Sequence, residues 1–140
     1  MAFALEIFFS TIKKGLTLNQ SLFKKVKIYF VGTSYAPKGK GKETISPIAK
    51  KYGLEKIVTE ITDRVPYFEA LKILKESDLL FVPGSTDENY TASKIYPYIL
   101  SKKPLVTIFN YKSSVVELVK ATNSRVVTVF SKASNIEKLS

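Results

Sequence analysis

A polar segment between two apolar runs carries the side chains best suited to binding chemistry. It runs from Gly84 to Lys94, follows the apolar run 79–83 and precedes a helical pattern over roughly residues 93–101. At the start of such a helix, free backbone N–H groups, the positive end of the helix dipole and a lysine converge on one spot. The segment therefore predicts an anion site, with phosphate as the expected occupant.

The residue types that are missing exclude several kinds of chemistry. The chain contains no cysteine and no histidine, so a disulfide framework, a thiolate metal site and a Ser-His or Cys-His triad are all excluded. Any catalysis has to use carboxylates, lysine, tyrosine or the charge of the substrate itself. We predict no metal site and no cofactor, and the sequence assigns no catalytic residue.

The net charge of +10 is concentrated in the first part of the chain. Residues 1–56 contain 11 lysines against three glutamates, which leaves +8, whereas residues 57–140 contain 11 basic and 9 acidic residues, which leaves +2. A basic surface favours nucleic acid, anionic lipid or an acidic small molecule as a partner. The alternative is that these lysines only solvate the surface.

The apolar N-terminal segment has helical spacing, and we predict an amphipathic helix over roughly residues 2–15. The segment is short, contains Glu6 and has no basic residue ahead of it, so it fits neither a signal peptide nor a membrane span. We expect it to pack on a sheet rather than to lie on a membrane. Because it precedes every predicted strand, we expect the chain to start in the middle of a larger fold.

Apolar runs and helical patterns then alternate along the chain. The runs predict strands at residues 27–32, 56–61, 79–83, 105–109 and 125–130. The patterns predict helices that start at Ser46, with Ser46 as N-cap and Pro47 at the first helical position, and after Pro66, then near residues 93–101, 115–119 and 134–139. This alternation is typical of a parallel sheet. We predict one α/β domain over residues 1–140, a three-layer Rossmann-like domain with a five-stranded parallel sheet and helices on both faces.

Ligands of such sheets bind in the loops that follow the carboxyl ends of the strands. The candidate loops are Gly32 to Lys42, Thr62 to Pro66, Gly84 to Lys94 and Asn110 to Ser114. The first of them is no P-loop, because neither Gly39-Lys40 nor Gly41-Lys42 is followed by Ser or Thr. It also lacks the glycine spacing of a dinucleotide fingerprint. We interpret it as a flexible basic loop, with a weak phosphate contact as the alternative.

The third of these loops carries a family resemblance. The sequence Gly84-Ser85-Thr86-Asp87, the run from Tyr90 to Leu100 and Lys103-Pro104-Leu105 resemble the nucleotide-sugar segment of bacterial group 1 glycosyltransferases. The resemblance extends over about residues 27–120. It includes Phe30-Val31-Gly32-Thr33, Arg64-Val65-Pro66-Tyr67, the stretch from Glu69 to Leu80, and Ser113-Ser114-Val115-Val116.

This resemblance implies a GT-B architecture, in which two Rossmann domains face each other and the C-terminal one holds the donor. The chain is long enough for one of them, so it resembles the donor-binding half of a cytoplasmic hexosyltransferase. The implied partners are a nucleotide sugar and a missing N-terminal acceptor-binding domain. No nucleic acid is expected, and peripheral membrane association of the full enzyme is left open. The isolated half should bind a nucleoside diphosphate but transfer no sugar.

The resemblance also implies which residues contact the donor diphosphate and sugar. They are Gly84, Ser85, Asn89, Thr91, Ser93, Lys94 and Arg64, with Glu88 and Gly32 as further candidates. The family often has two glutamates eight positions apart, and those places fall on Asn89 and Pro97. Proline has no side-chain donor or acceptor, so the usual ribose contact is in doubt. Because Pro97 has no N–H, its helix must start late or kink. A late start would put Ser93 at the cap.

Other interpretations of these residues remain open. Lys94 can be an ordinary surface lysine, Ser93 only a helix cap, and Arg64 the ion-pair partner of Asp63 or Glu60. Two other classes of function also remain. One is a non-catalytic Rossmann-like interaction or regulatory domain, and the other is a basic nucleic-acid-binding module, although no reading motif for RNA or DNA is present.

Overall fold

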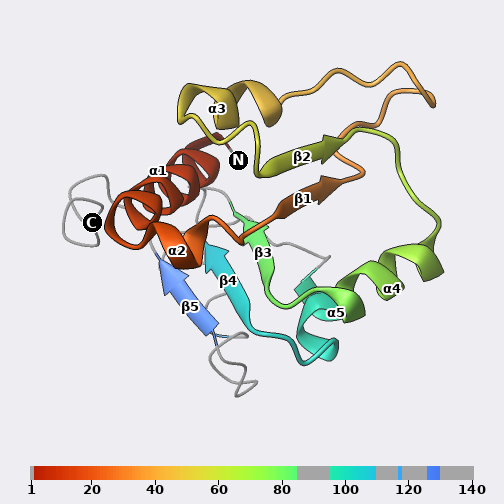
Figure 1. Cartoon of the computed structure of the whole chain (residues 1–140). Helices are drawn as coiled ribbons and strands as arrows, with labels where there is room; N and C mark the ends of the chain where they lie inside the picture. The colour runs from red at the N-terminus through yellow and green to blue at the C-terminus, as the bar shows by residue number, and fades with distance from the viewer. Residues whose placement is uncertain (1, 85–94, 110–116, 118–125, 130–140) are drawn as a thin grey trace. The chain divides into compact units, whose positions relative to one another are not determined.

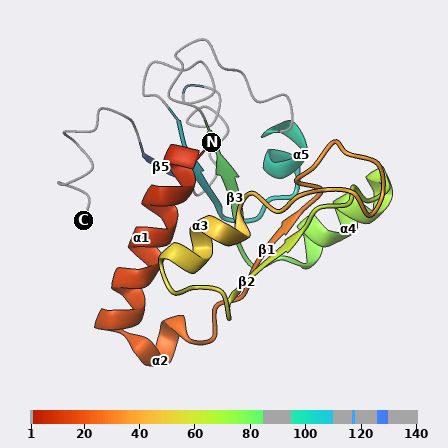
Figure 2. The same ribbon diagram turned by 90° about the horizontal axis from the view of Figure 1, so that it is seen from above.

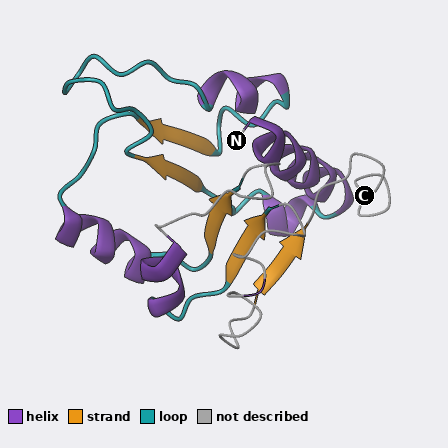
Figure 3. Ribbon diagram, turned by 180° about the vertical axis from the view of Figure 1, so that it is seen from behind, coloured by secondary structure: helices purple, strands orange, loops and turns teal. Residues whose placement is uncertain are grey.

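The computed structural model of the chain describes residues 2–84, 95–109, 117 and 126–129 (Figure 1). The chain forms two compact units, which we call the first unit (residues 4–66) and the second unit (residues 67–140). Helices and strands alternate along most of both units (Figure 3).

The first helix, α1 (Ala2–Leu18), packs on a strand, as its apolar spacing predicts. It buries Ala4, Leu5 and Phe9, and the ring of Phe9 meets the ring of Phe30 edge-on at a centroid distance of 6.0 Å. The helix is three residues longer at its C-terminal end than the apolar pattern predicted.

A short second helix, α2 (Gln20–Phe23), was not predicted from the sequence. Asn19 caps it, because its side-chain oxygen accepts a hydrogen bond from the N–H of Leu22 at 3.3 Å. The ring of Phe23 lies so close to Gly15 of α1 that a Cβ at Gly15 would collide with it. The absence of a side chain at Gly15 therefore lets α2 pack directly on α1.

The strands of the first unit, β1 (Ile28–Val31) and β2 (Val58–Ile61), are parallel and pair from Ile28↔Val58 to Val31↔Ile61. Val58 and Glu60 are buried on the face that also carries Phe30, whereas Tyr29 and Ile61 on the opposite face are 60% and 43% exposed. Helices α1 and α3 (Ser46–Lys51) contact the buried face (Figure 2). Within the first unit, helices thus cover one face of this sheet.

The start of α3 differs from the prediction. Pro47 lies in the first turn as predicted, but the N-cap is Ile45, and no side chain of the cap residue makes a capping hydrogen bond. The predicted cap, Ser46, is the first helical residue instead. Its backbone N–H is bound by the carboxylate of Glu60 on β2, which takes the place of a local cap.

The second unit contains helix α4 (Tyr67–Glu76), strand β3 (Leu80–Pro83), helix α5 (Ile95–Leu100) and strands β4 (Leu105–Ile108) and β5 (Val126–Val129). The three strands are parallel, in the order β3-β4-β5. The core of the second unit is formed by residues of strands β3 and β4, of helix α5 and of the position after β4. These residues are Leu80, Val82, Ile95, Leu105 and Phe109. The described part of helix α5 begins at Ile95 and includes Pro97. The predicted late start with Ser93 at the cap lies outside the described residues and stays a prediction.

The prediction of an α/β chain with parallel strands is confirmed, and all five predicted strands are present. The described strands form a two-stranded and a three-stranded sheet, so one five-stranded sheet in a single Rossmann-like domain stays a prediction. Of the predicted helix near residues 115–119, only Glu117 is described, and it is helical, whereas the predicted helix near 134–139 lies outside the described residues. No helix in the described part of the chain is both long and apolar enough to cross a membrane.

Candidate functional site

Two of the four predicted ligand loops meet at the carboxyl ends of β1 and β2. Together they line an open pocket of about 400 Å³. Its lining residues are Ala36 and Lys38 from the loop after β1, and Asp63, Arg64 and Pro66 from the loop after β2. The pocket therefore lies where parallel α/β sheets bind their ligands.

Backbone hydrogen bonds hold these two loops together. The N–H of Gly32 donates to the carbonyl of Ile61 at 2.8 Å, and the N–H of Ser34 donates to the carbonyl of Thr62 at 3.1 Å. Further along, the N–H of Gly39 donates to Oδ1 of Asp63 at 2.9 Å. The loop after β1 is thus fastened at three points, which the interpretation as a flexible loop did not anticipate.

Glycines permit this close approach of the two loops. Gly32 has a φ of +74°, a left-handed conformation that favours glycine, and a Cβ there would lie 3.6 Å from Cα of Arg64. At Gly41, a Cβ would lie 2.7 Å from Cβ of Thr62 and 2.9 Å from Cβ of Ser34. A side chain at Gly41 would therefore push the two loops apart.

The two cations of the pocket, Lys38 and Arg64, are not paired with a carboxylate of the described residues. The guanidinium of Arg64 lies over the exposed ring of Tyr35, with its Cζ 5.0 Å from the ring centroid. The alternative in which Arg64 pairs with Asp63 or Glu60 is therefore wrong. A stacked guanidinium keeps its N–H donors at the ring edge, so they remain available to an anion.

The buried carboxylate of Glu60 does not pair with Arg64 but accepts hydrogen bonds from the loop after β1 and the start of α3. Oε2 accepts the N–H groups of Ile45 at 2.9 Å and Ser46 at 2.8 Å. Oε1 accepts the hydroxyl of Thr33 at 2.7 Å and the N–H of Thr44 at 3.2 Å. The carboxylate thereby joins both ends of the loop after β1 to strand β2.

Electrostatics make Glu60 an anion at neutral pH. Burial acts to raise the pKa of Glu60, but the hydrogen bonds from three backbone N–H groups and one hydroxyl hold it below its ordinary value of 4.5. The start of α3, which by itself would attract an anion, is therefore already occupied by one. Among the described residues around these strand ends, the positive charge without a carboxylate partner belongs to Lys38 and Arg64, and not to the start of α3.

In the second unit, the predicted site residue Gly84 is buried, and neighbouring atoms fill the space around its Cα. Its N–H donates to the carbonyl of Ile108 at 2.8 Å, and a Cβ at this position would collide with that carbonyl and with the ring of Phe109. The close approach of two strands explains the glycine without a ligand.

The structure brings two of the predicted site residues, Gly32 and Arg64, close together, and Arg64 lines the pocket. The others lie outside the described residues: Ser85, Glu88, Asn89, Thr91, Ser93 and Lys94. The loop 110–114 also lies outside them. Sequence reasoning missed Lys38 and Asp63 as site residues, although both belong to loops that the strand ends had singled out.

Metal binding has no basis in the described residues, because no group of three or more Asp or Glu side chains comes together in them. Comparison of the chain with protein-family models, with curated proteins and with solved structures finds no match. The function of the site is therefore argued from its geometry and its sequence.

Proposed function

We propose that this chain is the donor-binding domain of a glycosyltransferase and holds the nucleoside-diphosphate part of a nucleotide sugar. The observation that carries the proposal is the pocket at the carboxyl ends of two parallel strands, bordered by Lys38 and Arg64, two cations that no described carboxylate pairs with. The resemblance to group 1 glycosyltransferases supplies the ligand class, and the pocket supplies a place of matching charge.

The pocket's chemistry suits a diphosphate that carries a sugar better than it suits a bare anion. Arg64 offers a planar fork for two phosphate oxygens, and Lys38 offers a point charge on a long stem. Asp63 uses Oδ1 for the N–H of Gly39, and the described residues provide no donor for Oδ2. A carboxylate oxygen repels phosphate but accepts a hydrogen bond from a ribose or sugar hydroxyl, so it selects ligands with both groups.

Transfer of a hexose needs donor and acceptor held together in one cleft. We therefore propose that residues 1–140 bind the donor without turnover and that a second domain supplies the acceptor side in the full enzyme. The segment from Ser85 to Lys94 is proposed as the remaining part of the donor site, on the strength of the resemblance alone.

Calorimetric titration with a panel of nucleoside diphosphates and nucleotide sugars tests the proposal. Replacing Lys38 by Ala removes a charge-assisted contact and should lower the affinity for the tightest-binding ligand of the panel by about 10- to 150-fold. The matched control is Lys40→Ala, which removes the same charge from the same loop at an exposed position that does not line the pocket. Its loss should be much smaller.

A second variant, Lys94→Ala, tests the part of the donor site that rests on the resemblance. We expect a loss of about 10- to 150-fold there as well. Equal losses for Lys38→Ala and Lys40→Ala would mean that the basic surface attracts anions diffusely. Wild-type protein that binds no nucleotide of the panel, or binds a short oligonucleotide more tightly, would refute the proposed function.

A further inference from the structure

The first unit carries a long stretch of the chain without any acidic residue. Between Glu6 and Glu43 there is no Asp or Glu, whereas eight lysines occur. Only three of these lysines, at positions 38, 40 and 42, belong to the loop near the pocket. The other five, Lys13, Lys14, Lys24, Lys25 and Lys27, flank the place where α1 meets α2, a segment of residues 13–27 that we call the α1–α2 corner.

The α1–α2 corner has a defined backbone. The N–H of Asn19 donates to the carbonyl of Gly15 at 2.8 Å, and the N–H of Phe23 donates to the carbonyl of Asn19 at 3.1 Å. Phe23 packs on Gly15, so the most apolar side chain of α2 faces α1. Its neighbour Leu22 is left pointing away from that contact.

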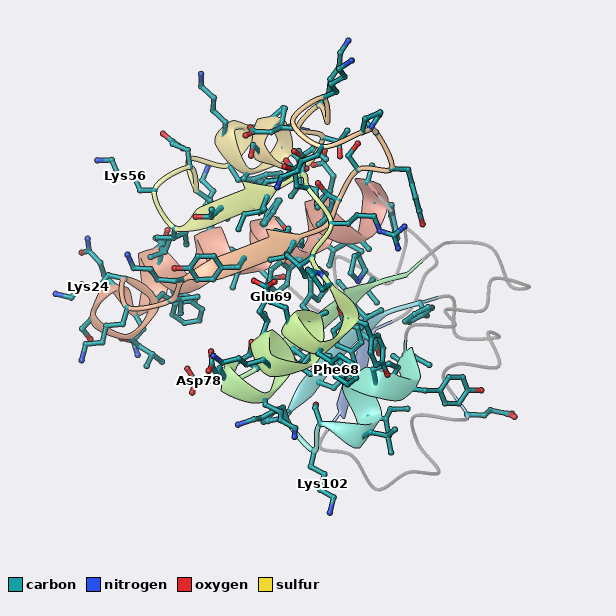
Figure 4. All side chains as sticks on the ribbon, turned by 90° about the vertical axis from the view of Figure 1, so that its right-hand side faces the viewer. Lys24, Lys56, Phe68, Glu69, Asp78 and Lys102 are labelled. Atoms are coloured by element: carbon teal, nitrogen blue, oxygen red, sulfur yellow. The ribbon has the colours of Figure 1, made fainter. Side chains whose placement is uncertain are left out.

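Two leucines of the corner are exposed to solvent without an evident role in folding. Leu18 is 86% exposed and Leu22 is 59% exposed. Each has an exposed lysine nearby in the chain: Lys14 lies one helical turn before Leu18 in α1, and Lys25 follows Leu22 by three residues, just beyond the end of α2. Figure 4 shows the side chain of Lys24 projecting from the ribbon near the end of α2. No lysine of the corner forms an ion pair with a described carboxylate.

We propose that the α1–α2 corner binds an anionic lipid surface. Lysines beside an anionic bilayer gain from the negative surface potential, and leucines next to them lose their contact with water by entering the headgroup region. The exposed leucines distinguish this partner from nucleic acid, whose phosphates would attract the lysines but offer nothing to Leu18 and Leu22. The inference is independent of the pocket and of the donor ligand.

Sedimentation with phosphatidylcholine vesicles, with and without phosphatidylserine, tests the proposal on the full chain. Wild-type protein should bind the vesicles that contain phosphatidylserine, and salt should weaken the binding. Replacing Lys24 and Lys25 by Glu should lower the partition coefficient by about 25-fold or more, since one lysine near an anionic surface is worth about fivefold. Replacing Leu18 and Leu22 by Ser should lower it by about tenfold without changing the charge.

The control variant replaces Lys40 and Lys42 by Glu. It makes the same change of charge at two exposed positions of the same acid-free stretch, and it should lose much less binding. Because all the replaced side chains are exposed, thermal unfolding should be unchanged in the three variants, and that measurement verifies folding. Full binding by the leucine variant, or equal losses for the two lysine pairs, would overturn the proposal. So would a wild-type dimer that the leucine variant converts to a monomer, because the corner would then join two copies.

Discussion

The substitution Glu60→Gln tests the most heavily bonded side chain of the first unit. It keeps the size of the side chain but replaces one carboxylate oxygen by an NH₂ group, which accepts no hydrogen bond. Two of the four donors that face Glu60 then lose their acceptor, whichever way the amide turns. The remaining two donate to a neutral oxygen in place of a charged one.

The expected loss follows from these contacts. A buried donor left without its acceptor costs about 1–3 kcal/mol. Loss of a negative charge at the start of a helix adds about 0.3–1 kcal/mol. With two such donors, we expect a destabilisation of about 2–7 kcal/mol, which is a large fraction of the stability of an ordinary domain, about 5–15 kcal/mol. The same variant should weaken nucleotide binding, because Glu60 holds both ends of the loop that carries Lys38.

Urea unfolding at neutral pH measures this loss, and Glu55→Gln is the control. Glu55 is exposed, and no hydrogen bond to its side chain is present in the described part of the chain, so the same chemical change should cost almost nothing there. The pKa of Glu60 is held below 4.5 in the folded state, so its contribution is present above that pH and is lost as the pH falls through the lowered value. The difference between wild type and Glu60→Gln should therefore shrink in acid. Equal stabilities of the two variants at neutral pH would refute this reasoning.

Three further substitutions are predicted from single contacts of the structure. Gly84→Ala should destabilise the second unit by about 1–3 kcal/mol in urea unfolding, because its Cβ collides with the carbonyl of Ile108. Gly41→Ala should cost about 1–3 kcal/mol in the first unit and also weaken the best nucleotide ligand, and binding at wild-type affinity would contradict the packing of the two loops. Tyr52→Phe removes the hydroxyl whose hydrogen bond is the largest cause of the lowered pKa of Glu6, so an NMR titration should find that pKa closer to 4.5. An unchanged pKa of Glu6 would contradict this assignment.

The sequence predicted those parts of the fold that depend on local pattern. Apolar runs located every strand among the described residues, and the structure shortens most of them by one or two residues at their ends. Helix α2 was missed because four residues form no recognisable period, and its stability depends on the cap at Asn19 and on the contact between Gly15 and Phe23. The predicted cap at Ser46 failed because a carboxylate 14 residues away binds that N–H instead.

The candidate site was predictable only in part for the same reason. Parallel strands have their loops at one edge, so the sequence singled out the loops of Gly32 and Arg64, and residues of both loops line one pocket. It did not reveal that Gly41 lets these loops touch, which is what puts Lys38 beside Arg64 in one pocket. Contacts of this kind depend on the register of β1 with β2, and no spacing within either loop encodes that register.

The double attachment of the loop after β1 to strand β2 has a consequence for the thermodynamics of ligand capture. Glu60 holds Thr33 at one end of this loop and Thr44 at the other, so much of its conformational entropy is already lost when the chain folds. A ligand that enters beside Lys38 then orders little more than side chains, and its binding carries only a small entropic penalty for the backbone. Its association should accordingly be a single fast step, without a slow phase from loop closure.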